Sequence, residues 1–181
     1  MELTWVKDTR PVWDADKQRV IGSAPPGALD LHHAPGAELP GDWWAAQDPK
    51  GRAVGFGWLD STWGGDAEIL LAVDSASQHQ GVGTFILEHI EREAARQGVN
   101  YVYNTVRSSH PDRDSVHDWL AARGYRGASS DTALRKRVRD EDEESAPPRA
   151  TSAGARSEPL SARPPGHEET GGYVNVEDHQ Y

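Results

Sequence analysis

The sequence contains no cysteine. Disulfide bonds, a thiol nucleophile and a zinc site with thiolate ligands are therefore excluded. Histidine does not offer an alternative metal site, because His32 and His33 are adjacent in a predicted loop and His110 and His117 stand seven residues apart without further ligands. We therefore expect no metal ion.

Long apolar runs are also absent. No stretch is apolar over the roughly 18 residues that a membrane span needs. The opening residues, MELTWVKDTR, lack the basic-then-apolar order of a signal peptide. These two absences predict a soluble, cytoplasmic protein without a membrane partner.

An excess of positive charge is the third absence. The formal net charge is −10, and residues 140–181 hold ten acidic and three basic residues, so the rest of the chain is nearly balanced. The basic run RKRVR at 135–139 is followed at once by DEDEE at 140–144. We interpret it as a solvated strand edge and expect no nucleic-acid partner.

The composition divides the 181 residues into two predicted parts. All seven tryptophans precede residue 120, whereas the segment after residue 139 is rich in Pro, Ser, Ala, Gly and Glu. We expect one folded domain over 1–139 and a disordered acidic tail over 140–181. The tail ends in GGYVNVEDHQY, which is either a short motif for a protein partner or an ordinary chain end.

Within 1–139 the pattern alternates between strands and helices. A helix is predicted from Asp14 to Gly22, a loop over 23–41, a second helix from Gly81 to Gly98, and a third with Pro111 in its first turn and Gly124 at its end. The predicted strands are LTWV (3–6), DWWAAQ (42–47) and RAVGFGWLD (52–60) around the turn DPKG, AEILLAV (67–73), VNYVYNTV (99–106) and TALRKRV (132–138). The unbroken apolar run at 67–73 favours a buried central strand.

The stretch QHQGVGTFIL, 78–87, places Gly81 and Gly83 between that strand and the second helix. The first N–H groups of a helix and its dipole attract an anion, and glycines let a phosphate approach the backbone. The alternative is a packing turn. A Walker loop is excluded because no Lys follows Gly83, and a dinucleotide-binding fingerprint is excluded because Ile86 stands where its third glycine belongs.

The segment Gln78-His79-Gln80-Gly81-Val82-Gly83 resembles the pyrophosphate loop, Q/R-x-x-G-x-G/A, of the GNAT superfamily of acyl-CoA-dependent N-acetyltransferases. The hairpins before it and the strand-helix-GY segment after it match the order of that family over about residues 3–138. The resemblance implies an α+β fold. Its central twisted sheet would have six to seven mostly antiparallel strands and flanking helices, with a cleft where the fourth and fifth strands splay apart.

The resemblance also implies acetyl-CoA as the co-substrate. The backbone of Ala72 and Val73 would hold the pantetheine arm. The pyrophosphate loop would supply Gln78, Gln80, Gly81, Val82, Gly83 and Thr84. The implied reaction is transfer of an acetyl group to an unidentified amine by direct attack in a ternary complex.

Glu68 resembles the strand-four glutamate that acts as general base in the histone-acetylating branch of the family. It lies ten residues before Gln78, one fewer than that branch has. A shift by one residue reverses the face of a strand side chain unless a bulge restores it. Glu68 is therefore either the base or a solvent-facing carboxylate at the strand end.

No residue matches the family's usual general acid, the tyrosine that protonates the departing thiolate. The family's tyrosine position corresponds to Leu120, which leaves Tyr103 and Tyr125 as weaker substitutes. His110 falls near the family's Asn after strand five and is either a cofactor-binding or acidic group or an ordinary residue at a helix start.

The acceptor is not named by any motif. The tryptophans and acidic residues favour a cationic or aromatic amine, either a small molecule or a peptide. Trp43 and Trp44 must face opposite sides of their strand, so one is expected in the core and the other in the acceptor pocket or on a homodimer surface. The alternative to an enzyme is a non-catalytic acyl-CoA-binding protein that engages a protein partner through its tail.

Overall fold

The computed structural model describes residues 1–139 except 30, 129 and 131. These residues belong to the first of two compact units of the chain, Met1–Ala146. The predicted tail, 140–181, and its tyrosine- and valine-containing end lie outside the described residues. In the described part, no helix is both long and apolar enough to cross a bilayer.

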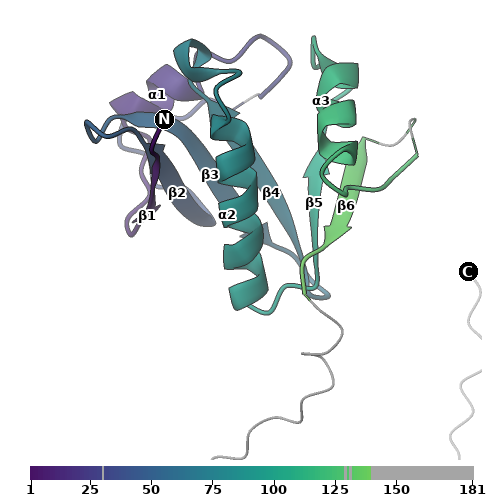
Figure 1. Ribbon diagram of the computed structural model, residues 1–181. Helices are drawn as coiled ribbons and strands as arrows, with labels where there is room; N and C mark the ends of the chain where they lie inside the picture. Colours follow the sequence, from purple (N-terminus) through teal and green to yellow (C-terminus); the bar gives the residue numbers. More distant parts are fainter. Residues whose placement is uncertain (30, 129, 131, 140–181) are drawn as a thin grey trace, which may run out of the picture. The chain divides into compact units, whose positions relative to one another are not determined.

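The described chain forms six strands, three α-helices and a short 3-10 helix (Figure 1). In chain order these are β1 (Thr4–Asp8), α1 (Ala15–Val20), β2 (Asp42–Gln47), β3 (Ala53–Ser61), β4 (Asp66–Val73), η1 (Ser75–Ser77), α2 (Val82–Arg96), β5 (Tyr101–Thr105), α3 (Arg113–Ala121) and β6 (Ala133–Arg137).

The strands form one sheet in the order β1-β2-β3-β4-β5-β6. Neighbouring strands are antiparallel except for β4 and β5, which are parallel. The predicted α+β class, with a mostly antiparallel sheet and flanking helices, is confirmed. The long apolar strand β4 lies inside the sheet, as its sequence predicts.

Strands β4 and β5 are paired only from Asp66 to Glu68, opposite Tyr101 to Tyr103. Beyond Glu68 the strands part, and the Asn104 side chain donates a 2.8 Å hydrogen bond to the Ile69 carbonyl at the point of separation. Figure 1 shows the two strands meeting at one end and diverging toward the other. The splay predicted between the fourth and fifth strands is confirmed.

Helix α2 packs on one face of the sheet. Its apolar residues recur every four positions, and each is at most 1% exposed: Val82, Ile86, Ile90 and Ala94. Beneath the helix, a Cβ on Gly55 of β3 would lie 2.5 Å from Ile86 Cδ1 and 2.9 Å from the Ala72 carbonyl oxygen. Glycine is therefore needed there for the close approach of α2 to the sheet.

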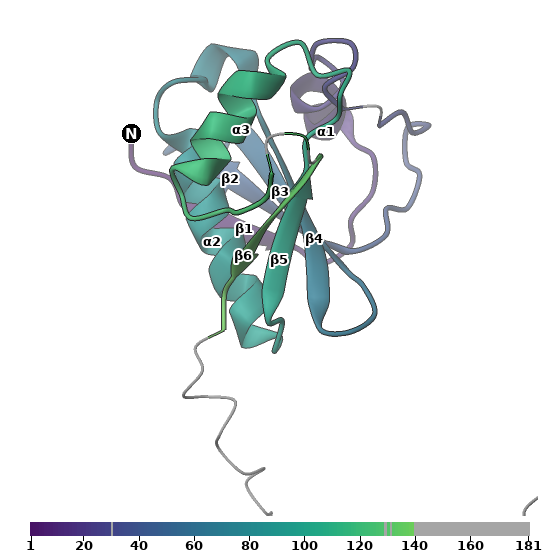
Figure 2. The same ribbon diagram turned by 90° about the vertical axis from the view of Figure 1, so that its right-hand side faces the viewer.

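The opposite face is covered by α1 and the loop over 23–41. Figure 2 shows α2 and α3 on one side of the sheet and α1 on the other. Asp14 caps α1 as predicted, because its Oδ1 accepts a 2.9 Å hydrogen bond from the Lys17 N–H. This second core contains Trp13, Val20, Ile21, Leu39, Trp43, Phe56 and Trp58.

Two predicted turns have different outcomes. The hairpin at DPKG is confirmed, since Asp48 Oδ1 accepts hydrogen bonds from the backbone of Lys50 and Arg52 between β2 and β3. The placement of Pro111 in the first turn of a helix is wrong. The chain first makes a separate turn, in which the Arg113 N–H donates to the His110 carbonyl, so α3 begins only at Arg113.

Candidate active site

The loop between β4 and α2 has an unusual backbone. His79 has a φ of 59° and Gly81 a φ of 83°, values that glycine adopts easily and other residues rarely. Gly81 is the N-cap of α2 and makes no side-chain capping bond. The first N–H groups of an α-helix have no intrahelical acceptor. Those at the start of α2 are therefore available to a ligand, with the positive end of the helix dipole behind them.

Gly83 is a position where the fold does not require glycine. A Cβ there would lie 3.5 Å from the Trp119 ring and 3.8 Å from Val73 Cγ2, which are ordinary contacts. Glycine inside a helix costs up to about 1 kcal/mol relative to alanine. The absent Cβ leaves the first turn of α2 open toward Trp119 and Val73, and a glycine in a first turn lets an anion approach the backbone.

Arg123 is a residue of this site that the sequence did not reveal. Its Nη2 donates a 2.8 Å hydrogen bond to Thr84 Oγ1 in the first turn of α2. Its guanidinium lies 4.1 Å from the centre of the Trp119 ring. A cation is therefore held beside the start of α2. No local pattern could have identified it, because Arg123 and Thr84 are 39 residues apart in the chain.

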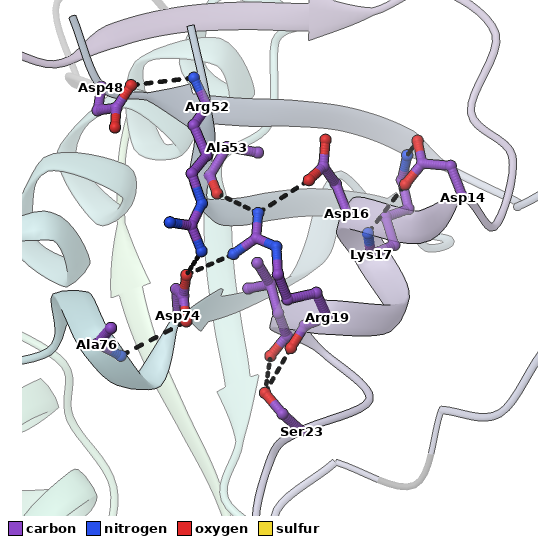
Figure 3. Close-up of polar contacts among 11 residues, drawn as sticks. Asp14, Asp16, Lys17, Arg19, Ser23, Asp48, Arg52, Ala53, Asp74 and Ala76 are labelled. Carbon is purple, nitrogen blue, oxygen red and sulfur yellow. Dashed lines mark hydrogen bonds and ion pairs between the residues drawn. The ribbon is translucent and has the colours of Figure 1, made fainter. Parts of the chain in front are cut away.

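Asp74 is a second residue near this loop whose role the sequence did not indicate. It directly follows β4, is 6% exposed, and accepts hydrogen bonds from the guanidinium groups of Arg19 and Arg52 (Figure 3). Its Oδ1 also accepts from the Ala76 N–H at 3.4 Å, and Arg19 donates in addition to the Ala53 carbonyl at 2.7 Å. One buried carboxylate thus ties the start of the loop to α1 and to the turn between β2 and β3.

Ala72 and Val73, the residues predicted to hold a pantetheine arm, lie at the end of β4. On one edge they pair with β3, opposite Phe56 and Gly55. On the other edge the ladder to β5 ends at Glu68 in the part of the chain that the structure describes. The β5-facing edge of β4 therefore carries backbone groups beyond the parallel ladder, next to the loop that leads into α2.

A cavity of about 280 Å³ lies on the face of the sheet opposite α2. Glu68 and Leu70 of β4, Asp60 of β3 and Thr105 of β5 contribute to its wall. Leu70 and Thr105 follow the last pair between β4 and β5. The cavity therefore opens where these two strands separate.

Glu68 is one of the residues that line this cavity. The register between β3 and β4 is continuous from Gly55 opposite Val73 to Ser61 opposite Ala67, so Glu68 and Leu70 share a face of β4. Glu68 stands opposite Asp60 on β3 and in register with Tyr103 on β5. Glu68 therefore lies on the face of β4 that borders the cavity, and its role as a general base stays a prediction.

The consecutive tryptophans of β2 face opposite sides of the sheet, as predicted. Trp44 is 2% exposed and stacks on Trp5 with ring centres 5.9 Å apart. Trp43 stacks on Trp58 with ring centres 4.4 Å apart, and both line the cavity. Trp63 is fully exposed. The remaining lining residues are Ala28, Leu29, Leu31, His33, Leu39, Pro40 and Arg107.

His110 lies in the turn before α3, where its Nδ1 accepts a 3.0 Å hydrogen bond from the Asp112 N–H. It is not among the described residues that line the cavity. Nor does any group of three His, Asp or Glu side chains among the described residues have an arrangement that could hold a metal ion.

The two residues nearest the family's tyrosine position are both in the core. Leu120 and Tyr125 are each 1% exposed. The Tyr125 hydroxyl donates a 3.0 Å hydrogen bond to Glu91 Oε1. Burial, together with the negative charge of Glu91, raises the pKa of Tyr125. Tyr103 is half-buried and stands beside Glu68 in the β4–β5 ladder.

A mostly antiparallel sheet whose one parallel pair parts beside a glycine-capped helix defines a GNAT-type fold. The same fold occurs in a GCN5-related N-acetyltransferase from Kribbella flavida, at 17% identity and a TM-score of 0.51 over 75% of this chain and 97% of that one. It also occurs in a candidate acyl-CoA N-acyltransferase from Klebsiella pneumoniae subsp. pneumoniae, at 16% identity and a TM-score of 0.52 over the same shares. No curated protein sequence matches the chain.

The model of the acetyltransferase (GNAT) family matches residues 6–126. The chain belongs to this family. Membership supports acyl-CoA-dependent acetyl transfer in general, with an acyl-CoA as the co-substrate.

Proposed function

We propose that the protein is an acetyl-CoA-dependent N-acetyltransferase that acts on an amine by direct attack in a ternary complex. The observation that carries this proposal is the position of the cavity. It opens where β4 and β5 part, and its wall includes a carboxylate, Glu68. An acyl chain lying between the strands and an amine in the cavity would meet there.

The residues at the end of β4 and the start of α2 would hold the co-substrate. Backbone groups of Ala72 and Val73 lie beyond the β5 ladder and suit a pantetheine amide. The pyrophosphate would bind at the start of α2, over Gln78, Gln80, Gly81, Val82, Gly83 and Thr84. Arg123, bonded to Thr84, adds a positive charge to this site.

Glu68 would act as the general base, directly or through a water molecule. Acetyl-CoA supplies an activated acetyl group as a thioester. The bound ammonium group loses one proton to Glu68, and the neutral nitrogen bonds to the acetyl carbon while the carbon–sulfur bond breaks and the sulfur leaves with its electron pair. The nitrogen then loses its second proton to solvent, and Glu68 releases its own proton to solvent. Solvent then protonates the thiolate, because the tyrosine position holds the buried Leu120. The hydrogen bond from Asp112 supports a structural role for His110 at the start of α3.

The test of the co-substrate site is Gly83→Glu. An acidic residue in the first turn stabilises an empty helix, so thermal unfolding should occur at the same or a higher temperature. The same carboxylate would repel a pyrophosphate and should weaken acetyl-CoA binding by about tenfold or more, as measured by isothermal titration calorimetry.

Gln97→Glu is the charge-matched control. It adds the same charge at the exposed C-terminal end of α2, where the side-chain amide of Gln97 donates a hydrogen bond to Asp42. Its acetyl-CoA affinity should equal that of the parent protein. Equal affinity in a folded Gly83→Glu variant would contradict the proposed site.

A further inference from the structure

The cavity has one apolar wall made of stacked indoles. Trp43 and Trp58 lie 4.4 Å apart with planes 7° from parallel, and neither is more than 6% exposed. The Nε1 of Trp43 donates to the Pro40 carbonyl at 2.8 Å, so its one polar atom is already satisfied. Rigid aromatic walls of this kind favour an apolar, flat part of a ligand.

The polar side of the cavity carries two carboxylates. Asp60 and Glu68 stand directly opposite each other on β3 and β4, and like charges in that position destabilise a sheet. Within the described residues, neither carboxylate takes part in an ion pair or a hydrogen bond. A bound cation would relieve this repulsion. Arg107 also lines the cavity but already has another interaction.

The size of the cavity limits the acceptor. Its volume of about 280 Å³ lies at the lower end of the range of small-molecule sites, which is about 300–1,000 Å³. This volume matches a single ring with a short alkylamine, with the ring against the indoles and the ammonium group between the carboxylates.

We infer that the acceptor is a compact primary monoamine with an apolar, flat body, of the arylalkylamine class. This inference rests on the proposed N-acetyltransferase function and adds the class of its acceptor. An amino acid is disfavoured because its carboxylate, adjacent to the amine, would approach Asp60 and Glu68. A polyamine is disfavoured because it has no flat apolar body to lie against the indole wall.

The test compares three amines that differ by one feature each. 2-Phenylethylamine has both the ring and a lone ammonium group, phenylalanine adds a carboxylate, and ethylamine lacks the ring. We expect kcat/KM for thiol release from acetyl-CoA to be at least about tenfold higher for 2-phenylethylamine than for the other two. A preference for phenylalanine, ethylamine or spermidine would overturn the inference while leaving acetyl transfer intact.

Binding without acetyl-CoA separates this inference from the proposed function. 2-Phenylethylamine should change the tryptophan fluorescence of the protein alone, since it would lie against Trp43 and Trp58. If it binds in this way but neither it nor any other amine is acetylated, the cavity assignment holds and the proposed function fails. If it does not bind and other amines are acetylated, the acceptor class is wrong.

Asp60→Asn tests the carboxylates without disturbing the core, because Asp60 is exposed. It should raise KM for 2-phenylethylamine by about threefold to tenfold and leave acetyl-CoA affinity unchanged. Glu88→Gln, on the exposed side of α2, removes the same charge away from the cavity and should change neither. An unchanged KM in Asp60→Asn would contradict the assignment.

Discussion

Tyr125 shows at the scale of one residue how burial decides between two roles. A tyrosine close to the end of α3 could donate a proton to a leaving thiolate, yet Tyr125, four residues after that end, is 1% exposed and bonds to Glu91. Lys136 binds the other oxygen of the same carboxylate at 2.8 Å. Because burial and the charge of Glu91 raise its pKa, Tyr125 stays protonated and acts as a packing residue.

The raised pKa of Tyr125 predicts a loss of stability in alkali. The unfolded chain ionises this tyrosine above its ordinary pKa of 10.0 while the folded chain does not. The contribution of Tyr125 to the free energy of unfolding is therefore complete below pH 10 and falls by about 1.4 kcal/mol per pH unit above it. The Tyr125→Phe variant does not lose stability in this way, because phenylalanine has no hydroxyl to ionise. In urea unfolding, the parent's advantage over Tyr125→Phe should be about 1 to 2 kcal/mol near pH 8 and should nearly disappear near pH 11.

An advantage that stays constant over this range would contradict the account of Tyr125. Tyr101→Phe is a suitable control, because Tyr101 is only half-buried on β5. Its difference in stability from the parent should change little between the same two pH values.

For Glu68, the sequence predicts the residue type and the strand, but not the face of the strand on which the side chain lies. Its residue type and its place near the end of a strand are local properties, and the sequence contains both. Its face depends on strand register, and a shift of one residue exchanges the two faces. The register is fixed by pairing with Asp60 and Tyr103, which belong to other strands of the sheet. Only the structure therefore shows which face of β4 carries Glu68.

At the scale of elements, the loop before α2 depends on Asp74. Its carboxylate is buried between Arg19 and Arg52, and Arg19 also binds the exposed Asp16 at 2.8 Å. The hydrogen bond to Asp16, together with the charge of Asp74, raises the pKa of Arg19. Arg19 therefore stays charged in every condition in which the protein is folded.

Asp74→Asn should lower the free energy of unfolding by about 1 to 3 kcal/mol, because it leaves a partly buried guanidinium with a weaker partner. Asp16→Asn removes an ion pair to the same arginine, but at an exposed carboxylate, and should cost at most about 0.5 kcal/mol. Urea unfolding of both variants checks this difference. Equal losses in the two variants would show that Asp74 does not anchor the loop.

The elements themselves were largely predictable. The start of α2 follows from Gly81 and the four-residue apolar period, and the hairpin follows from DPKG, because these signals lie within a few residues. The cavity was not predictable in the same way. Its wall combines Trp43, Trp58 and Thr105 with residues of the loop over 23–41, and these come together only through the order of the strands.

At the scale of the whole described molecule, the two proposed binding regions lie at the same break in the sheet. The loop and the start of α2 follow the end of β4, while the cavity opens on the face opposite α2. The separation of β4 from β5 beyond Glu68 is the feature that both share. Under the proposed function, the thioester and the amine would reach this break from different sides of the sheet, and that arrangement favours direct transfer over a covalent intermediate on the protein.

The central claim is that this chain transfers acetyl groups with Glu68 as the base. The most direct measurement is the rate at which N-acetylated 2-phenylethylamine forms from acetyl-CoA, followed by mass spectrometry alongside thiol release. We predict one acetylated amine per thiol for the parent protein, and a kcat lower by about 10²- to 10⁴-fold in Glu68→Gln with unchanged acetyl-CoA affinity. Binding of acetyl-CoA without acetylation of any amine, amino acid, polyamine or peptide would contradict the claim and favour a non-catalytic acyl-CoA-binding protein.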